Sequence, residues 1–362
     1  MHAAKVKNTI ISIIPTDPAL VAEAMAHIDS LTKPVGSLGR LEELAAKLFA
    51  IQGGEKQDGE KPLCVDPARI ITAAGDHGVC EEGVSSSPSV VTRQQIYNFL
   101  NGGGGISVLC ACNGIQHLVA DIGVAGEEFA DHPLLARRRV ANGTANMSKG
   151  PAMTKEECLA AVAAGITLAE EAAAQNVRCL GTGEMGIGNT TPSTALFAAL
   201  YGFAPEDIVG PGAGVPPAGM QGKIDVIKKS LRVNEAGIAD GDPLHILAAL
   251  GGLEIAALTG LILGGAANRI PVVIDGFIST AAYAVAHACN EHVKDYCFFA
   301  HASAEPGHRH IMERIGERPL VDLDFRLGEG TGAVFGMVIL RNAAAIFNTM
   351  ATFTSAGVSG SV

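Results

Sequence analysis

Two glutamates in glycine-rich stretches have the residue type and the setting for acid–base chemistry. Glu329 is flanked by glycine on both sides, where a loop meets an apolar helical pattern. Glu184 lies inside the stretch G-T-G-E-M-G-I-G-N-T-T, which begins at residue 181. Two carboxylates at one site can divide the roles of general base and electrostatic stabiliser between them. From the residues alone, a purely structural role for Glu329 is favoured, as an acid at the positive end of a helix dipole.

The stretch around Glu184 predicts a strand, a glycine loop and the start of a helix. Residues 177–180 are apolar and read as a short buried strand, and an apolar run begins at Pro192. Proline favours the first helical position, and Thr191 is placed to cap the free amides. The residues between strand and helix include Gly181, Gly183, Gly186, Gly188, Asn189 and Thr190. Such a loop lets backbone N–H groups approach a phosphate, although a purely structural turn would use the same glycines.

The same glycines match the G-x-G-x-x-G pattern of dinucleotide-binding folds, with Glu206 and Asp207 about twenty residues further on. That motif needs its helix to begin within the glycine triplet. Here the predicted helix begins several residues later, so a phosphate site of another kind fits better. A dinucleotide-dependent dehydrogenase and a non-catalytic nucleotide-binding module nevertheless stay open as alternatives.

A second glycine-rich segment, G-P-G-A-G at residues 210–214, offers another backbone cradle. Lys223 follows in a predicted helix and would supply positive charge for an anionic ligand. The alternative is an ordinary surface lysine, since Lys228 and Lys229 lie nearby in the sequence.

Metal and nucleophile motifs are weak in this sequence. Asp76-His77 and the pair His308 and His310 suggest ligands, but two histidines two positions apart do not share a helix face. The eight cysteines include no C-x-x-C pair, which predicts reduced cysteines in the core. We therefore expect no metal, and Asp76 and His77 are assigned instead to orienting loops.

Composition limits the class of protein. The chain has 362 residues, 48% of them hydrophobic, and a formal charge of −11. This acidic balance argues against nucleic acids and anionic membranes as partners. The N-terminus lacks a signal-peptide pattern, and the longest apolar run noted, residues 255–267, is too short to span a membrane. We expect a cytoplasmic enzyme.

Apolar strands alternate with helical patterns from residue 68 onward. Expected strands lie at 69–74, 118–122, 177–180, 271–274 and 296–300, and expected helices include 18–31, 38–51, 91–100, 155–175, 222–231, 243–250, 253–263, 277–289 and 333–346. This alternation predicts an α/β fold with a mainly parallel sheet covered on both faces. Polar clusters follow each strand, so we expect one composite site at the carboxyl edge. The two ends of the chain, 1–67 and 326–362, are predicted to form a small helical domain beside a large domain of 68–325.

Several long motifs together resemble one family, the nicotinate-nucleotide–dimethylbenzimidazole phosphoribosyltransferases. The matching stretches cover nearly the whole chain and read K-P-x-G-S-L-G-R-L-E-x-L-A (33–45), A-G-D-H-G-V-x-x-E-G-V-S (74–85), P-x-x-V-T-x-Q (88–94), G-T-G-E-M-G-I-G-N-T-T (181–191), D-G-F-I-S (275–279), H-x-S-A-E-P-G-H (301–308) and L-G-E-G-T-G-A (327–333). The resemblance implies a Rossmann-like homodimeric enzyme without metal or organic cofactor. It implies transfer of phosphoribose from nicotinate mononucleotide to 5,6-dimethylbenzimidazole.

By motif position, the resemblance makes Glu329 the catalytic base and Glu184 the second active-site carboxylate. It places Ser87, Gln95, Met185 and Leu327 around the acceptor base. The ribose-phosphate site would then use Lys223, Ser303 and the loops around Gly186, Asn189, Thr190 and Gly212.

Overall fold

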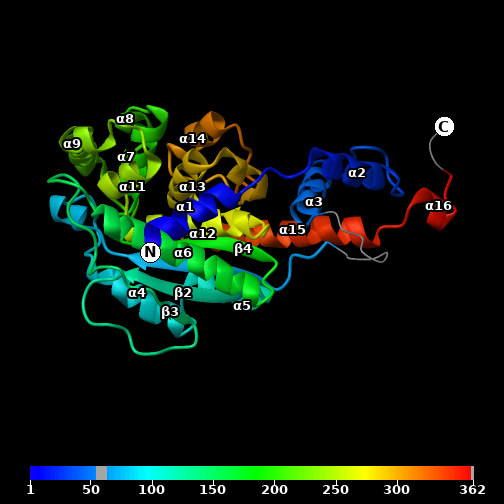
Figure 1. The fold of residues 1–362 in the computed structure, drawn as a ribbon, viewed down its shortest axis with the longest axis horizontal. Coiled ribbons are helices and arrows are strands. Elements are labelled where there is room, and N and C mark those ends of the chain that lie inside the picture. The colour runs from blue at the N-terminus through cyan, green and yellow to red at the C-terminus, as the bar shows by residue number, and fades with distance from the viewer. Residues whose placement is uncertain (54–62, 360–362) are drawn as a thin grey trace.

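The computed structural model describes residues 1–53 and 63–359, and its described part is built around a six-stranded sheet (Figure 1). The strands lie in the order β3-β2-β1-β4-β5-β6, and every neighbouring pair is parallel. Their bounds are β1 Ala68–Gly75, β2 Gln116–Gly123, β3 Leu135–Arg137, β4 Cys179–Met185, β5 Val272–Ile274 and β6 Cys297–Phe299. The predicted parallel α/β fold is confirmed. Strand β3 was not predicted, because three residues carry no periodic signal.

Helices cover both faces of the sheet. Helix α12 (Leu253–Ala267) contacts β1, β2, β4 and β5, and α6 (Lys155–Ala174) packs against its outer side. The glycines Gly165 and Gly260 allow this pair to approach closely, because a Cβ on either would meet a carbonyl of the other helix. Helices α4 (Val90–Leu100), α5 (Gly105–Asn113) and α15 (Thr331–Thr349) contact the sheet on the opposite face. The pleat of β4 shows this division: Leu180 lies towards α12, whereas Gly181 lies towards α15.

Strand β4 corrects the predicted glycine loop. The strand runs through Gly181 and Gly183 to Met185, so the loop is confined to residues 186–189. Helix α7 (Thr190–Tyr201) begins before Pro192, and Asn189 rather than Thr191 is its N-cap residue. The physical reason is contact with the segment from Glu329 into α15. A Cβ at Gly181 would meet Met337 and Ala333, and one at Gly183 would meet the Glu329 carbonyl. Since two of the three fingerprint glycines lie in the strand, the dinucleotide interpretation loses its basis.

The terminal segments pack in two places. Helices α2 (Pro18–Asp29) and α3 (Arg40–Ile51) pack on each other, and α3 packs on α15, at one end of the long axis (Figure 1). Helix α1 (His2–Ser12) instead contacts α6 and α12. Helix α1 of segment 1–67 therefore lies against helices of the predicted large domain. Residues 54–62 of the segment lie outside the described residues. The domain boundaries at 68 and 326 stay a prediction.

The remaining helices complete the layers. They are the 3-10 helices η2 (Gly78–Glu82) and η3 (Glu291–Tyr296) and the α-helices α8 (Pro205–Ile208), α9 (Pro217–Val233), α10 (Glu235–Ile238), α11 (Pro243–Leu250), α13 (Phe277–Cys289), α14 (His308–Ile315) and α16 (Phe353–Ala356). Helix α15 is long and apolar enough to cross a membrane by length and composition, although Gly332, Gly336 and Arg341 interrupt its apolar run. Its buried face packs on β1, β4, β5 and β6, as in a core helix.

Gly183→Ala is expected to destabilise the protein by about 1–3 kcal/mol, because its Cβ would push against the Glu329 carbonyl and Thr72. It should also lower activity by displacing Glu329. Thermal unfolding and turnover are the measurements. Gly222→Ala on α9 is the matched control, since a Cβ there meets open space and alanine favours a helix. Equal unfolding temperatures for the two variants would contradict the close approach.

Candidate active site

A cavity of about 440 Å³ lies where strands β4, β5 and β6 end. Its lining comes from the strand ends, the loop 186–190, the segment 212–214 and the loop before α15. The structure thus brings most of the predicted site residues to one place. Those lining the cavity are Gln95, Glu184, Met185, Gly186, Asn189, Thr190, Gly212, Ser303, Leu327 and Glu329.

Two predicted site residues lie elsewhere. Ser87 lines a neighbouring cavity of about 650 Å³ together with Asp76 and Cys80, and its place beside the acceptor base stays a prediction. Lys223 lies behind the main cavity, with its side chain buried and its Nζ donating to Thr190 Oγ1 and to the Gly210 carbonyl, both at 2.8 Å. The surface-lysine alternative is therefore wrong, and Lys223 supports the loop that would face a phosphate.

Glu329 is held from outside its own helix. It has a left-handed backbone (φ 65°), and its carboxylate Oε2 accepts the Ile106 N–H at 3.1 Å. Gln95 Nε2 lies 3.5 Å from Oε1. The helix-dipole interpretation was thus partly right, but the amides belong to the start of α5 rather than to α15. Burial raises the pKa of Glu329 above its usual range, and the α5 amides oppose that rise.

Asp275, at the end of β5, fixes the loop that carries Glu329. Its carboxylate accepts the N–H groups of Gly330 at 3.2 Å and Ala333 at 3.0 Å, at the N-terminus of α15. His301 Nε2 lies 3.7 Å from it. The sequence marked Asp275 only as part of a polar cluster after a strand, so its contact with the loop that carries Glu329 was missed.

Glu184 ends β4 and has different partners. Asn189 Nδ2 donates a short hydrogen bond to its Oε2. Burial raises the pKa of Glu184 to about 8, and the negative charges of Asp275 and Glu254 add to the rise. Among these protein neighbours at neutral pH, Glu184 therefore holds a proton. Burial thus raises the pKa of both Glu184 and Glu329, but the two carboxyl groups have different hydrogen-bond partners.

The histidines noted in the sequence have structural partners. His77 Nε2 pairs with Glu254 Oε1 at 2.7 Å beneath the 186–189 loop, where both side chains are buried. His308 Nδ1 accepts the Ser303 N–H at 2.8 Å, which leaves Nε2 to donate to Thr280 Oγ1. Burial lowers the pKa of His308 to about 3, so it stays neutral. His310 is exposed. Across residues 1–53 and 63–359, no cluster of three metal-ligating side chains occurs.

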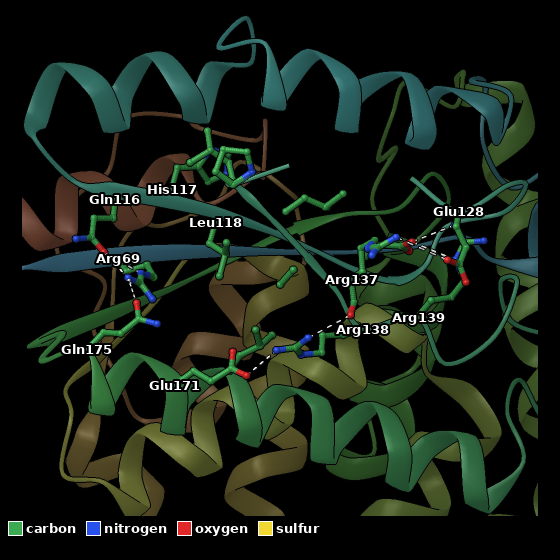
Figure 2. A pocket seen from close by; sticks show the side chains of 16 residues that line it. Arg69, Gln116, His117, Leu118, Glu128, Arg137, Arg138, Arg139, Glu171 and Gln175 are labelled. Carbon is green, nitrogen blue, oxygen red and sulfur yellow. Dashed lines mark hydrogen bonds and ion pairs between the residues drawn. The ribbon is translucent and has the colours of Figure 1, made fainter. Parts of the chain in front are cut away.

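A larger cavity, of about 860 Å³, lies at the β3 edge of the sheet (Figure 2). Arginine side chains line this cavity and have the charge to bind anions. However, Arg137, Arg138 and Arg139 each already pair with a carboxylate. Arg137 pairs with Asp131 at 2.5 Å, Arg138 with Glu171 at 2.5 Å, and Arg139 with Asp121 at 3.0 Å. This cavity is therefore a poorer candidate for a phosphate than the carboxyl-end site.

Comparisons with known protein families, sequences and structures agree with one another. A family model described as "Phosphoribosyltransferase" matches residues 13–358. The nicotinate-nucleotide–dimethylbenzimidazole phosphoribosyltransferase of Nitratidesulfovibrio vulgaris (strain DP4) is 54% identical, covering 98% of each chain. That of Geobacter sulfurreducens is 50% identical, covering 96% of each. The crystal structure of the enzyme of this name from Thermus thermophilus matches with a TM-score of 0.87 and 44% identity, over 95% of this chain and 100% of that one.

Glu184→Gln is expected to stabilise the protein more at pH 8 than at pH 5. The unfolded chain releases the Glu184 proton near its ordinary pKa of 4.5, whereas the folded protein holds it up to about 8. Stability is therefore lost as the pH rises across this window, and the variant avoids that loss, which is on the order of a few kcal/mol at pH 8. Unfolding temperatures at both pH values measure it, with the exposed Glu313→Gln as control. A pH-independent difference would contradict the assignment.

Proposed function

The chain belongs to the nicotinate-nucleotide–dimethylbenzimidazole phosphoribosyltransferase family, and we propose that it works by a single inverting displacement with Glu329 as general base. It is a phosphoribosyltransferase of cobalamin biosynthesis. The proposed donor is nicotinate mononucleotide and the acceptor is 5,6-dimethylbenzimidazole, giving α-ribazole 5′-phosphate and nicotinate. The observation that carries the mechanism is one cavity holding two carboxyl groups with different partners. A homodimer and a cytoplasmic location, which we also propose, stay predictions.

The acceptor step requires a base at a defined place. One benzimidazole nitrogen attacks the anomeric carbon and becomes positively charged, and loss of the proton from the other nitrogen relieves that charge. Glu329 suits this transfer because Ile106 N–H fixes one of its oxygens while its other oxygen faces Gln95. Met185 and Leu327 line the same cavity and offer apolar contact to the methylated ring. A positioned base of this kind contributes roughly 10²–10⁴-fold.

The donor step requires charge stabilisation rather than an acid. The glycosidic electron pair moves onto the pyridinium nitrogen, so nicotinate departs without being protonated. The anomeric carbon becomes oxocarbenium-like, and a nearby carboxylate stabilises that charge. Glu184 holds a proton among its protein neighbours alone, but a bound cationic ring favours its ionised form. The reaction as written balances without a metal or organic cofactor.

The phosphate is assigned to the N-terminal end of α7. The Gly186–Thr190 segment and Gly212 line the cavity here, and Lys223 stands directly behind Thr190. Burial lowers the pKa of Lys223 to about 8, and the carboxylate of Glu305 acts against that fall. A bound phosphate would add a second negative partner and strengthen the charged form of Lys223.

The product assay tests the reaction itself. Protein incubated with nicotinate mononucleotide and 5,6-dimethylbenzimidazole should release nicotinate and an α-linked riboside phosphate, identified by NMR. The α configuration would reflect one displacement at the anomeric carbon. A β-linked product would instead indicate two displacements, and absence of product would reject the assigned substrates.

Glu329→Gln tests the base. We expect the turnover rate to fall roughly 10²–10⁴-fold, with little change in donor binding, because the amide cannot accept the proton. The wild-type rate should also fall as the pH drops through the raised pKa of Glu329, above 4.5, and this limb should vanish in the variant. Glu313→Gln, an exposed glutamate on α14, serves as the control. Near-normal turnover by Glu329→Gln would remove this residue from the mechanism.

A further inference from the structure

The loop that carries Glu329 has an unfavourable backbone conformation. Gly328, Glu329 and Gly330 follow one another with positive φ values of 81°, 65° and 101°. Glycine adopts this left-handed region freely, but a glutamate does so at a cost. Such a residue keeps its conformation only where the surrounding structure holds it. The groups that hold this loop therefore decide where the Glu329 carboxylate lies in the cavity.

Two side chains from different strands hold one peptide group of this loop. Thr72 Oγ1, on β1, donates to the Glu329 carbonyl at 2.9 Å. Asp275, at the end of β5, accepts the Gly330 N–H at 3.2 Å. The Glu329 carbonyl and the Gly330 N–H belong to the same planar peptide group. Strand β4 lies between β1 and β5 in the sheet, so this peptide is held from both sides of β4.

The hydroxyl of Thr72 is itself oriented by His117. Nε2 of His117, on β2, lies 3.0 Å from Thr72 Oγ1. Since Thr72 has one hydroxyl proton and donates it to the Glu329 carbonyl, His117 Nε2 is the donor in its own contact. Burial lowers the pKa of His117 to about 4, so at neutral pH the ring is uncharged and Nε2 carries its N–H. This contact directs the Thr72 proton towards the loop that carries Glu329.

Thr72 lies outside the active-site cavity. Its side chain is fully buried, and it is not among the residues that line the cavity containing Glu184 and Glu329. Of the two hydrogen-bond partners of its hydroxyl in the described part of the chain, His117 lines the separate cavity at the β3 edge. The hydrogen bond to the Glu329 carbonyl is therefore the contact through which this hydroxyl influences the active site.

We infer that Thr72 and Asp275 are positioning residues for the proposed base, because together they fix the plane of the Glu329–Gly330 peptide. This inference rests on the proposed role of Glu329. With the peptide fixed, the Glu329 carboxylate stays where the Ile106 N–H binds it. Without either partner the loop is free to leave its left-handed conformation. A displacement of about 1 Å at a catalytic group lowers a rate by roughly 10²-fold.

Thr72→Val removes the hydroxyl and keeps the shape of the side chain. We expect kcat to fall about tenfold or more, while KM for nicotinate mononucleotide changes less than about twofold, because the loop moves and the donor contacts do not. Thr72→Ser keeps the hydroxyl and should restore kcat to within about threefold of the wild-type value. Asp275→Asn should also lower kcat, since an amide has one acceptor atom for the two N–H groups that Asp275 binds.

A second background separates positioning from a general loss of stability. In a Glu329→Gln protein, Thr72→Val should lower the rate less than about twofold further, because no base remains to be misplaced. The matched control is Thr259→Val. Thr259 is a buried threonine on α12 that donates to the Ile255 carbonyl outside the cavity, and its loss should leave kcat unchanged.

Three outcomes would overturn the inference. They are a normal kcat in Thr72→Val, an equal fall of the rate in both backgrounds, and a Thr72→Ser protein no faster than Thr72→Val. The proposed base fails separately, if Glu329→Gln alone turns over at a near-normal rate.

Discussion

The site depends on one close approach, between the loop that carries Glu329 and the end of strand β4. Gly183 leaves room for the Glu329 carbonyl, which accepts a hydrogen bond from Thr72 Oγ1 at 2.9 Å. Asp275 then holds the start of α15 through backbone N–H groups. A side chain at position 183 would move the loop outward, and the Glu329 carboxylate with it. The glycine in the strand is therefore as much a part of the site as the glutamates, because it sets how near the two come.

Collecting carboxyl groups in one buried cavity is electrostatically unfavourable, and their partners decide how that charge is distributed. Asp275 and Glu329 accept backbone N–H groups, which stabilise their ionised forms. Burial raises the pKa of all three groups, to about 8 for Glu184, where the charges of Asp275 and Glu254 add to the rise and the Asn189 amide opposes it. In the proposed mechanism Glu329 is the base, and Glu184 ionises when a cationic ring enters. Such an arrangement favours function at the expense of stability.

The sequence predicted the parallel sheet, most helices and the clustering of polar residues at the strand ends, because periodicity and strand-end chemistry are local signals. It misplaced the glycine loop, since Gly181 and Gly183 look like loop residues until the helix packed on them is known. It also missed Asp275 as a support for Glu329, because residues 275 and 330 meet only in the folded chain. Ser87 was assigned by motif position alone; it lines the cavity next to the main one, and its contact with the acceptor base stays a prediction.

The α7 N-terminus has a consequence for the proposed displacement. Lys223 contacts Thr190 at this end of the cavity, and this is where we propose that the donor's phosphate is held. With the phosphate anchored, the ribose carbon is the part of the donor left free to move. In an inverting displacement that carbon moves away from the leaving nitrogen and towards the acceptor, while the phosphate need not move. Anchoring the phosphate therefore orients the reacting bond without opposing its motion, which is how binding energy lowers a barrier rather than deepening the ground state.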